Sequence, residues 1–354
     1  MGFIQRILLA NRGRRYPGLA LGMVALALVP AVIDDYGLDL LILCLYYLVL
    51  AASWNLVAGY AGQFSLATVA FAAIGAYTTA LLGAYFGGPP WAGIIAATVV
   101  AGLSGLLLGV MVLKMHSSYL AITTWAFAVT IQIVLTAGYR VTRGYLGLSV
   151  RPLLGDLDPT HYYYVFLVMA VGCLAIIAVI LNSPIGYFIR AIKDDQLRAS
   201  TLGIDTTRWK VFIFSVSSAM AGLDGACYAH YTVILSPAMA DFSEMGKVLI
   251  MVLIGGMGTF WGPVVAVPVV EVLYSYLQGY GQWAIVIYAM VAIVVMRTHR
   301  AGLSTLLYGS PGPLGRSVYR AMKQVVTFGR LGEHSSKPEV PVHVDQVPPR
   351  KHTE

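Results

Sequence analysis

The sequence predicts an all-α polytopic membrane protein with about ten transmembrane helices, some of them broken or re-entrant. Of its 354 residues, 58% are hydrophobic and 11% are charged, and the mean hydropathy is +0.76. Soluble domains carry about 25% charged residues. The apolar residues also fall in blocks of roughly 20, the length that crosses a ~30 Å hydrocarbon core. Together these observations exclude a soluble fold.

The apolar blocks divide the chain into three regions. A basic cytoplasmic amino terminus is expected at 1–16, a transmembrane domain at 17–297 and a cytoplasmic tail at 298–354, which is partly disordered because proline and polar residues dominate it. The 37 glycines predict close helix packing, since small residues let membrane helices approach one another. The expected spans are 17–33, 38–58, 66–86, 91–113, 117–138, 162–181, 211–234, 245–260, 262–280 and 282–297.

Basic residues set the expected orientation. The net charge is +7, and the excess lies at the two ends and in one internal segment, as cytoplasmic flanks of membrane helices require. This placement argues against a nucleic-acid partner. Arginines within 6–15 put the amino terminus inside, and alternation of the spans then puts 190–210 and the carboxyl-terminal tail inside as well. Three basic residues would lie outside and oppose the rule: Arg140, Arg143 and Arg151.

Two stretches interrupt the apolar pattern with glycine and polar residues. Non-helical backbone at membrane depth must be buried in protein or line a wet cavity, so the first stretch predicts a broken helix that faces a transport path. Its candidate path residues are Asn55, Gly59, Gly62, Gln63 and Ser65. The alternative is that the polar members only cap interrupted helix ends.

The neighbouring Trp54 is expected to anchor the chain at a membrane interface. The second stretch divides the apolar run 248–277 and predicts a tight turn or helix break. Its residues are Gly255, Gly256, Gly258, Gly262 and Pro263.

Two carboxylates fall inside apolar segments. Asp224 lies well within the span expected at 211–234, where a charged side chain costs at least ~2.5 kcal/mol on insertion scales. Asp224 is therefore a candidate for the transport path or a subunit interface, and we expect it to face protein or a polar cavity. A protonated or hydrogen-bonded packing role is the alternative. Glu271 has the same two interpretations, so the sequence leaves open whether either one contacts a solute.

The segment 183–210 predicts a short amphipathic helix at the cytoplasmic surface. Ser183 is expected as the N-cap, Pro184 as the first helical residue and Gly203 as the carboxyl-terminal stop. A helix that lies on lipid carries mainly lysine and arginine on its polar face. Here acidic residues stand beside the basic ones, so docking into a groove of a partner protein is favoured.

Four stretches carry a resemblance to a known family. They are the runs 53–66, 190–205, 221–230 and 255–263, within a similarity that extends over about residues 40–297. The chain resembles the M-type permease subunits of high-affinity branched-chain amino acid ABC importers. The resemblance implies that the cytoplasmic segment contacts an ATPase subunit through Arg190, Ala191, Lys193, Asp194, Asp195, Arg198, Ala199 and Gly203.

The resemblance also implies partners and a location. They are a homologous H-type permease subunit, two cytoplasmic ATP-binding subunits, a periplasmic solute-binding protein and the lipid bilayer of a bacterial inner membrane. Related permeases carry branched-chain amino acids, urea and short amides, or aromatic acids. The solute therefore stays open, as does pairing with an identical copy instead of a homologous permease.

The motifs of an enzyme are missing from the sequence. It has no G-x-x-x-x-G-K-[ST] loop for nucleotide phosphates, so ATP is expected to be hydrolysed on separate subunits and no cofactor is expected on this chain. Cys44, Cys173 and Cys227 stand singly, and neither a disulfide nor a metal site is inferred. The alternative function is an ion-coupled secondary transporter or channel, in which Asp224 and Glu271 would bind the ion.

Overall fold

The computed structural model describes residues 29–31, 33–112, 117–155 and 158–277, together with residues 283, 286, 287, 290, 293 and 297. The chain divides into two units, 1–304 and 305–354. The second unit lies outside the described residues, and so does the predicted amino-terminal region 1–16. The first expected span, at 17–33, and the last, at 282–297, fall mostly outside them as well.

Within the described part, six helical segments are long and apolar enough to cross a membrane. Their positions match six of the expected spans to within a few residues. The first combines α3 (Asp35–Trp54) with a π-helical turn, η2 (Asn55–Tyr60). The others are α4 (Thr68–Phe86), α5 (Pro90–Val112), α6 (Ser117–Ala137), α8 (Pro159–Asn182) and α11 (Thr206–Thr232).

Two further apolar helices are shorter than the spans expected at 245–260 and 262–280. Helix α12 (Phe242–Gly255) has 14 residues and α13 (Trp261–Leu277) has 17. At 1.5 Å per residue α12 reaches about 21 Å, less than a ~30 Å hydrocarbon core. Helix α13 is described as far as Leu277, and residues 278–282 lie outside the described part. A cap fixes where α12 begins, since the Asp241 side chain accepts a hydrogen bond from Ser243 N at 3.2 Å. The prediction of about ten spans is therefore not confirmed.

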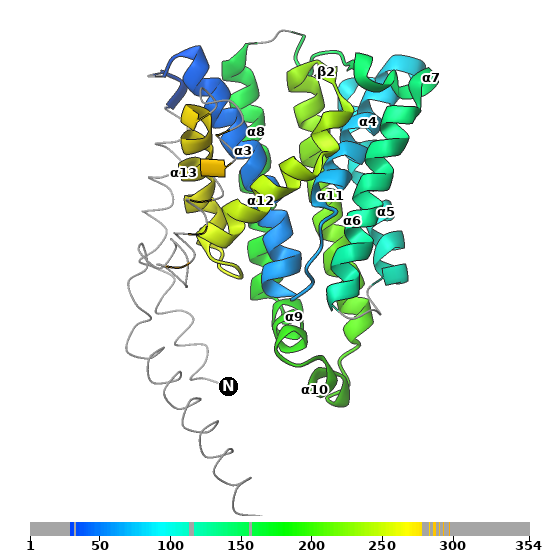
Figure 1. Cartoon of the computed structure of the whole chain (residues 1–354), viewed down its shortest axis with the longest axis vertical. Coiled ribbons are helices and arrows are strands. Elements are labelled where there is room, and N and C mark those ends of the chain that lie inside the picture. The colour runs from blue at the N-terminus through cyan, green and yellow to red at the C-terminus, as the bar shows by residue number, and fades with distance from the viewer. Residues whose placement is uncertain are drawn as a thin grey trace, which may run out of the picture. The chain divides into compact units, whose positions relative to one another are not determined.

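The two short helices are joined by the predicted glycine turn. Gly256 and Gly258 have φ angles of 104° and 77°, which a residue with a Cβ rarely adopts. Figure 1 shows α12 crossing in front of α3 before the chain turns into α13. Gly256 and Gly258 lie in the turn that reverses the chain, whereas Gly255 is the last residue of α12 and Gly262 and Pro263 lie in the first turn of α13.

Helix α11 is the centre of the helix packing, with α3, α4 and α5 against it. Small residues permit the close approach. Gly225 lies against the backbone of Ala72 in α4, and Gly222 lies between α4 and α5, against Gly75 and Ala101. The three cysteines are free and buried.

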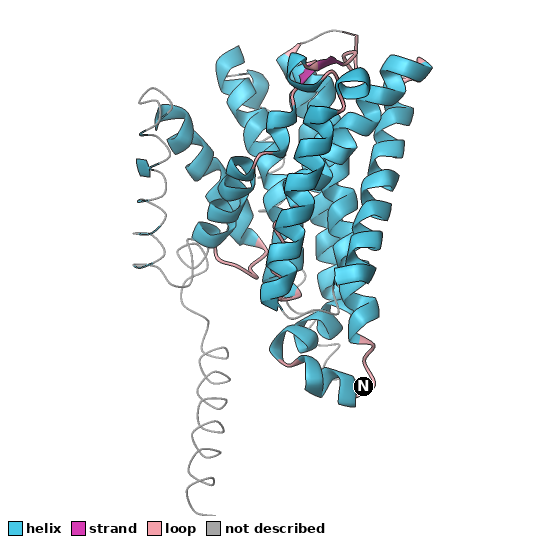
Figure 2. Cartoon of the chain, turned by 45° about the vertical axis from the view of Figure 1, so that its right-hand side comes forward, coloured by secondary structure: helices cyan, strands magenta, loops and turns pink. Residues whose placement is uncertain are grey.

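Short elements close one end of the helices. After α6 come α7 (Tyr139–Thr142), η3 (Gly144–Leu146) and β1 (Leu148–Ser149). β1 pairs antiparallel with β2 (Ile234–Leu235), which follows α11, with Leu148 opposite Leu235. The structure also has two 3-10 turns, η1 (Val29–Ala31) and η4 (Pro237–Ala240). Figure 2 shows the two strands at this end and helices over nearly all the rest.

The opposite end carries two helices where the sequence predicted one. They are α9 (Pro184–Asp194) and α10 (Gln196–Thr201). The chain breaks at Asp195, whose φ and ψ of −158° and 106° are extended and whose side chain caps α10 by accepting from Leu197 N and Arg198 N, each at 3.0 Å. An aspartate inside a helical pattern competes for such a cap. Pro184 begins α9 and Gly203 is left-handed at φ 82°, as predicted. Ser183 holds the N-cap position, but its hydroxyl donates to Ile180 O instead of capping α9.

Candidate functional site

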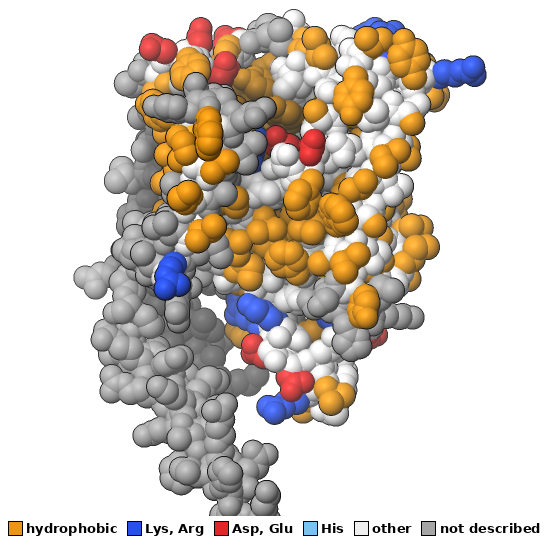
Figure 3. All heavy atoms as spheres, in the orientation of Figure 1, with side chains coloured by type: hydrophobic (Ala, Val, Ile, Leu, Met, Phe, Trp, Pro, Cys, Tyr) orange, Lys and Arg blue, Asp and Glu red, His pale blue; other side chains and the backbone are white. Residues whose placement is uncertain are grey.

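A cavity of about 360 Å³ opens between α3, α11, α12 and α13. Its apolar lining includes Leu43, Leu235 and Met239. Figure 3 shows a small group of acidic and basic side chains part-way along the mostly apolar face, away from the charges at both ends. The polar lining of the cavity comes chiefly from four tyrosines and three charged residues: Tyr46, Tyr47, Tyr228, Tyr274, Glu244, Lys247 and Glu271.

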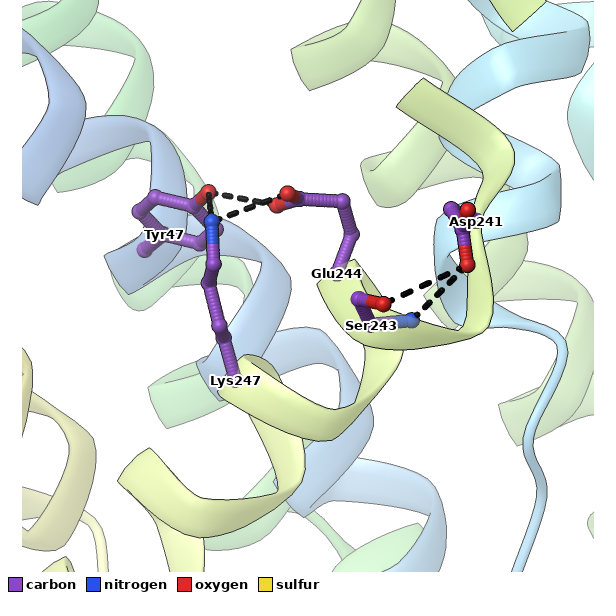
Figure 4. A network of polar contacts seen from close by, with 5 residues as sticks. All are labelled: Tyr47, Asp241, Ser243, Glu244 and Lys247. Atoms are coloured by element: carbon purple, nitrogen blue, oxygen red, sulfur yellow. Dashed lines mark hydrogen bonds and ion pairs between the residues drawn. The ribbon is translucent and has the colours of Figure 1, made fainter. Parts of the chain in front are cut away.

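Three of these side chains form one polar network. Glu244 and Lys247 stand three residues apart on α12, which places them on the same face of the helix, and Lys247 Nζ lies 2.8 Å from Glu244 Oε1. The Tyr47 hydroxyl on α3 donates to Glu244 Oε2 at 2.6 Å and accepts from Lys247 Nζ at 3.3 Å. Figure 4 shows the three converging, while Asp241 and Ser243 point away. The network joins α12 to α3 across the cavity wall.

Glu271 lies on α13 in the lining of the same cavity. It is 3% exposed, and its Oε2 has no hydrogen-bond partner among the described residues. A buried carboxylate oxygen without a donor is costly. Glu271 therefore places a buried carboxyl group with one unpaired oxygen at the wall of the cavity.

Asp224 does not line this cavity. It lies one helical turn before Tyr228 on α11, is 0% exposed, and neither carboxylate oxygen has a partner in the described part of the chain. The Tyr228 ring stacks on Tyr46 of α3, with ring centroids 4.3 Å apart. Asp224 therefore faces protein and not lipid, as predicted. Its role as a path residue stays a prediction.

The interrupted stretch after α3 is braced against the glycine turn. The Asn55 side chain donates from Nδ2 to Thr259 O at 2.9 Å and accepts at Oδ1 from Gly258 N at 2.8 Å. A Cβ on Gly59 would lie 2.5 Å from Gly258 N, so only glycine fits there. Two stretches some 200 residues apart in sequence thus form one packed unit.

The other predicted path residues surround this unit. Gly62 is exposed with φ 70°, and Gln63 and Ser65 are buried. The Gln63 amide has no partner among the described residues. Trp54 is fully buried and donates from Nε1 to Ser65 O at 2.6 Å. The prediction that Trp54 anchors at a membrane interface is wrong, because its indole N–H satisfies the non-helical backbone instead.

Helix α9 also contacts the packed unit of η2 and the glycine turn. Lys193 Nζ donates to Gly59 O in η2 at 2.6 Å, and the Arg190 guanidinium lies 5.8 Å from the Tyr60 ring centroid. A π-helical turn leaves carbonyl groups outside the regular ladder, and Lys193 satisfies one of them. We call the set Asn55, Gly59, Lys193, Gly258 and Thr259 the junction.

The remaining residues predicted for ATPase contact are distributed over both helices. Asp194 is exposed, Arg198 pairs with Asp195 within α10 at 2.9 Å, and Gly203 is exposed at the end of the segment. Ala191 is half-buried, and Ala199 is 2% exposed because it packs within this chain. The segment also presents two exposed leucines, Leu197 and Leu202, at 75% and 80% exposure.

Of the polar residues that line the cavity, sequence reasoning singles out Glu271 and misses the others, among them Tyr46, Tyr47, Glu244 and Lys247. Tyr46 and Tyr47 lie in an uninterrupted apolar run, where they count as ordinary membrane residues. Glu244 and Lys247 carry a usable signal, since opposite charges three residues apart precede the apolar run from Val248.

A second cavity of about 420 Å³ lies at the β1–β2 end, lined in part by Thr79, Arg151 and His230. The His230 ring is 2.9 Å from Thr79 Oγ1 and 2.7 Å from Arg151 O. Both ring nitrogens are therefore engaged, and His230 has a structural role in tying α4, α11 and the loop after β1 together.

Comparison with known proteins decides the family. The family model described as branched-chain amino acid transport system / permease component matches residues 36–297, which holds the cavity, the junction and the segment 183–210. The chain belongs to this family. The resemblance drawn from the four sequence stretches is confirmed, and the chain is a transport subunit of the permease family, not an enzyme.

Curated members of the permease family are similar over most of the chain. The high-affinity branched-chain amino acid transport system permease protein LivM of Salmonella typhimurium is 29% identical over 313 residues, covering 80% of this chain and 73% of that protein. LivM of Escherichia coli is 29% identical over 302 residues, covering 77% and 71%. The guanosine ABC transporter permease protein NupQ of Bacillus subtilis is 24% identical over 238 residues, covering 61% and 73%. No solved structure matches the chain.

Proposed function

We propose that this chain is the membrane-spanning permease subunit of an ATP-driven importer of branched-chain amino acids or related small solutes. The observation that carries this proposal is the family match over residues 36–297 together with the LivM relatives. Since the guanosine permease NupQ is also related, relatedness alone does not fix the solute. A homologous permease completes the path, a periplasmic binding protein delivers the solute, and two ATP-binding subunits supply the energy.

The cytoplasmic helices α9 and α10 are the proposed contact with the ATPase. Leu197 in α10 and Leu202 directly after it are exposed although large and apolar, as expected of a segment that inserts into a partner's groove. Lys193 links α9 to η2, and Asn55 links η2 to the turn before α13. When the ATPase displaces α9, these two links therefore move η2 and the turn before α13, and with them the helices that form the polar cavity.

The proposed contact with the ATPase implies one orientation of the chain in the membrane. The α9–α10 end faces the cytoplasm of a bacterial cell with the chain in the inner membrane, and both termini lie on that side by the distribution of lysine and arginine. The β1–β2 end, with Arg140, Arg143 and Arg151, then faces outward.

Charging the exposed leucines is expected to uncouple the ATPase. The double variant Leu197→Glu, Leu202→Glu places two carboxylates where the partner's apolar groove would close, and we expect at least about a tenfold weaker association with the ATPase. The measurement is the amount of ATP-binding subunit that co-purifies with the permease pair in detergent. The matched control is Leu197→Met, Leu202→Met, which keeps apolar volume and is expected to co-purify normally. Normal co-purification of the glutamate variant would exclude α10 as the docking helix.

A further inference from the structure

The lining of the cavity between α3, α11, α12 and α13 holds two carboxyl groups, Glu244 and Glu271, and one ammonium group, Lys247. Glu244 and Lys247 neutralise each other at 2.8 Å, and Tyr47 occupies the second oxygen of Glu244. Glu271 adds a further carboxylate whose Oε2 is buried without a partner among the described residues. A buried carboxylate is retained at such a place when a cation or donor joins it.

The walls of the cavity already hold an ammonium group. Lys247 Nζ lies 4.5 Å from the Tyr274 ring centroid and 5.6 Å from that of Tyr47. Ring faces attract organic ammonium ions through their quadrupole. Tyr46 and Tyr228 add two more aromatic rings to the lining.

The rest of the lining is mostly aliphatic, with Thr232 and Ser236 as further polar members. Leu43, Ile234, Leu235 and Met239 border the polar groups, and about 360 Å³ is within the range of small-molecule sites. A solute with one ammonium group and a short branched hydrocarbon matches both halves of the lining.

We propose that this cavity is a transport subsite that binds its solute by an ammonium group on Glu271, among Tyr46, Tyr228 and Tyr274, with the hydrocarbon part against Leu43, Leu235 and Met239. The inference rests on the proposed function and deepens it, because it selects aliphatic amino acids over uncharged solutes such as amides and nucleosides. The Glu244–Lys247 pair holds the wall on which the solute lies.

The test is direct binding to the assembled transporter without its solute-binding protein. The permease pair and ATPase are purified together, placed in lipid nanodiscs and titrated with radiolabelled 3-methylbutylamine. Its neutral counterpart 3-methylbutanol and the acid 4-methylpentanoate serve as competitors, with leucine as a third. The amine is expected to bind and to be displaced by leucine, while the alcohol and the acid compete at least about tenfold more weakly.

The variant Glu271→Gln keeps the shape of the side chain and removes its charge, so it is expected to weaken amine binding at least about tenfold. The matched control is Asp241→Asn, a carboxylate at the start of α12 that points away from the network in Figure 4. Asparagine is also a good N-cap, so α12 is retained, and the control is expected to bind the amine within about twofold of wild type. Intact assembly is checked by size-exclusion chromatography.

Equal competition by the amine and the alcohol in the wild-type complex would overturn the proposal without relying on any variant. Unchanged amine binding in Glu271→Gln, or displacement of the amine by sodium ions alone, would also overturn it. The proposed function is tested separately, by ATP-dependent uptake. If it is wrong, the wild-type complex shows no such uptake, whether or not the amine binds.

Discussion

Replacing Lys193 with methionine is expected to reduce ATP-driven uptake at least about tenfold while the ATPase stays bound. The Lys193 ammonium donates to Gly59 O at 2.6 Å and connects α9 to the π-helical turn η2. Methionine is an unbranched side chain one atom shorter than lysine, and it removes a charge-assisted hydrogen bond, the stronger class of hydrogen bond. Movement of α9 would then no longer reach η2, and hydrolysis would proceed without transport. Uptake and ATP hydrolysis are measured on the same proteoliposomes, so that the ratio of solute moved to ATP consumed is the readout.

The matched control is Arg208→Met, which also removes one positive charge and lies at the same end of the helices as Lys193. Arg208 is exposed at the start of α11, and its guanidinium lies 5.9 Å from the neighbouring Trp209 ring centroid. This control is expected to keep the wild-type ratio. A wild-type ratio in Lys193→Met as well would show that the junction does not transmit the motion of α9.

The second large effect is expected at the centre of the helix packing. A Cβ on Gly225 would lie 2.6 Å from the carbonyl carbon of Ala72 in α4, and backbone atoms cannot move aside as a flexible side chain does. Gly225→Val is therefore expected to destabilise the fold by more than the ~1–3 kcal/mol typical of overpacking, because α4 and α11 must separate. Thermal unfolding of the purified chain in detergent measures the effect.

The matched substitution is Gly172→Val in α8, where no atom lies within 4 Å of an added Cβ. Its melting temperature is expected to stay near that of wild type. If the two valine variants melted at the same temperature, close packing at Gly225 would not be what holds α4 against α11.

Composition and the length of apolar blocks suffice to predict the helical membrane fold and the positions of six spanning segments. They fail where long-range contacts determine the structure. The run expected to span at 245–260 becomes the shorter α12, because Asp241 caps one end and the glycine turn closes the other. Asp195 similarly ends α9 by capping α10. Both aspartates were visible in the sequence, but apolar periodicity gives no weight to such caps.

The candidate site was predictable in part. Glu271 stood out because a carboxylate in an apolar helix is costly. Tyr46 and Tyr228 did not, since a tyrosine in an apolar run is ordinary until its ring is seen to stack on another from a different helix. The junction was half predicted. The sequence marks both glycine-rich interruptions, but nothing local indicates that Asn55 holds the backbone of Gly258 and Thr259.

The most direct test of the central claim is leucine uptake into proteoliposomes that contain this chain, its homologous permease, the ATP-binding subunits and the solute-binding protein. An ATP-driven permease subunit predicts that uptake requires ATP, stops when any one partner is left out, and is unaffected when sodium and proton gradients are collapsed. Uptake by this chain alone, driven by a sodium or proton gradient without ATP, would contradict the account and identify an ion-coupled transporter.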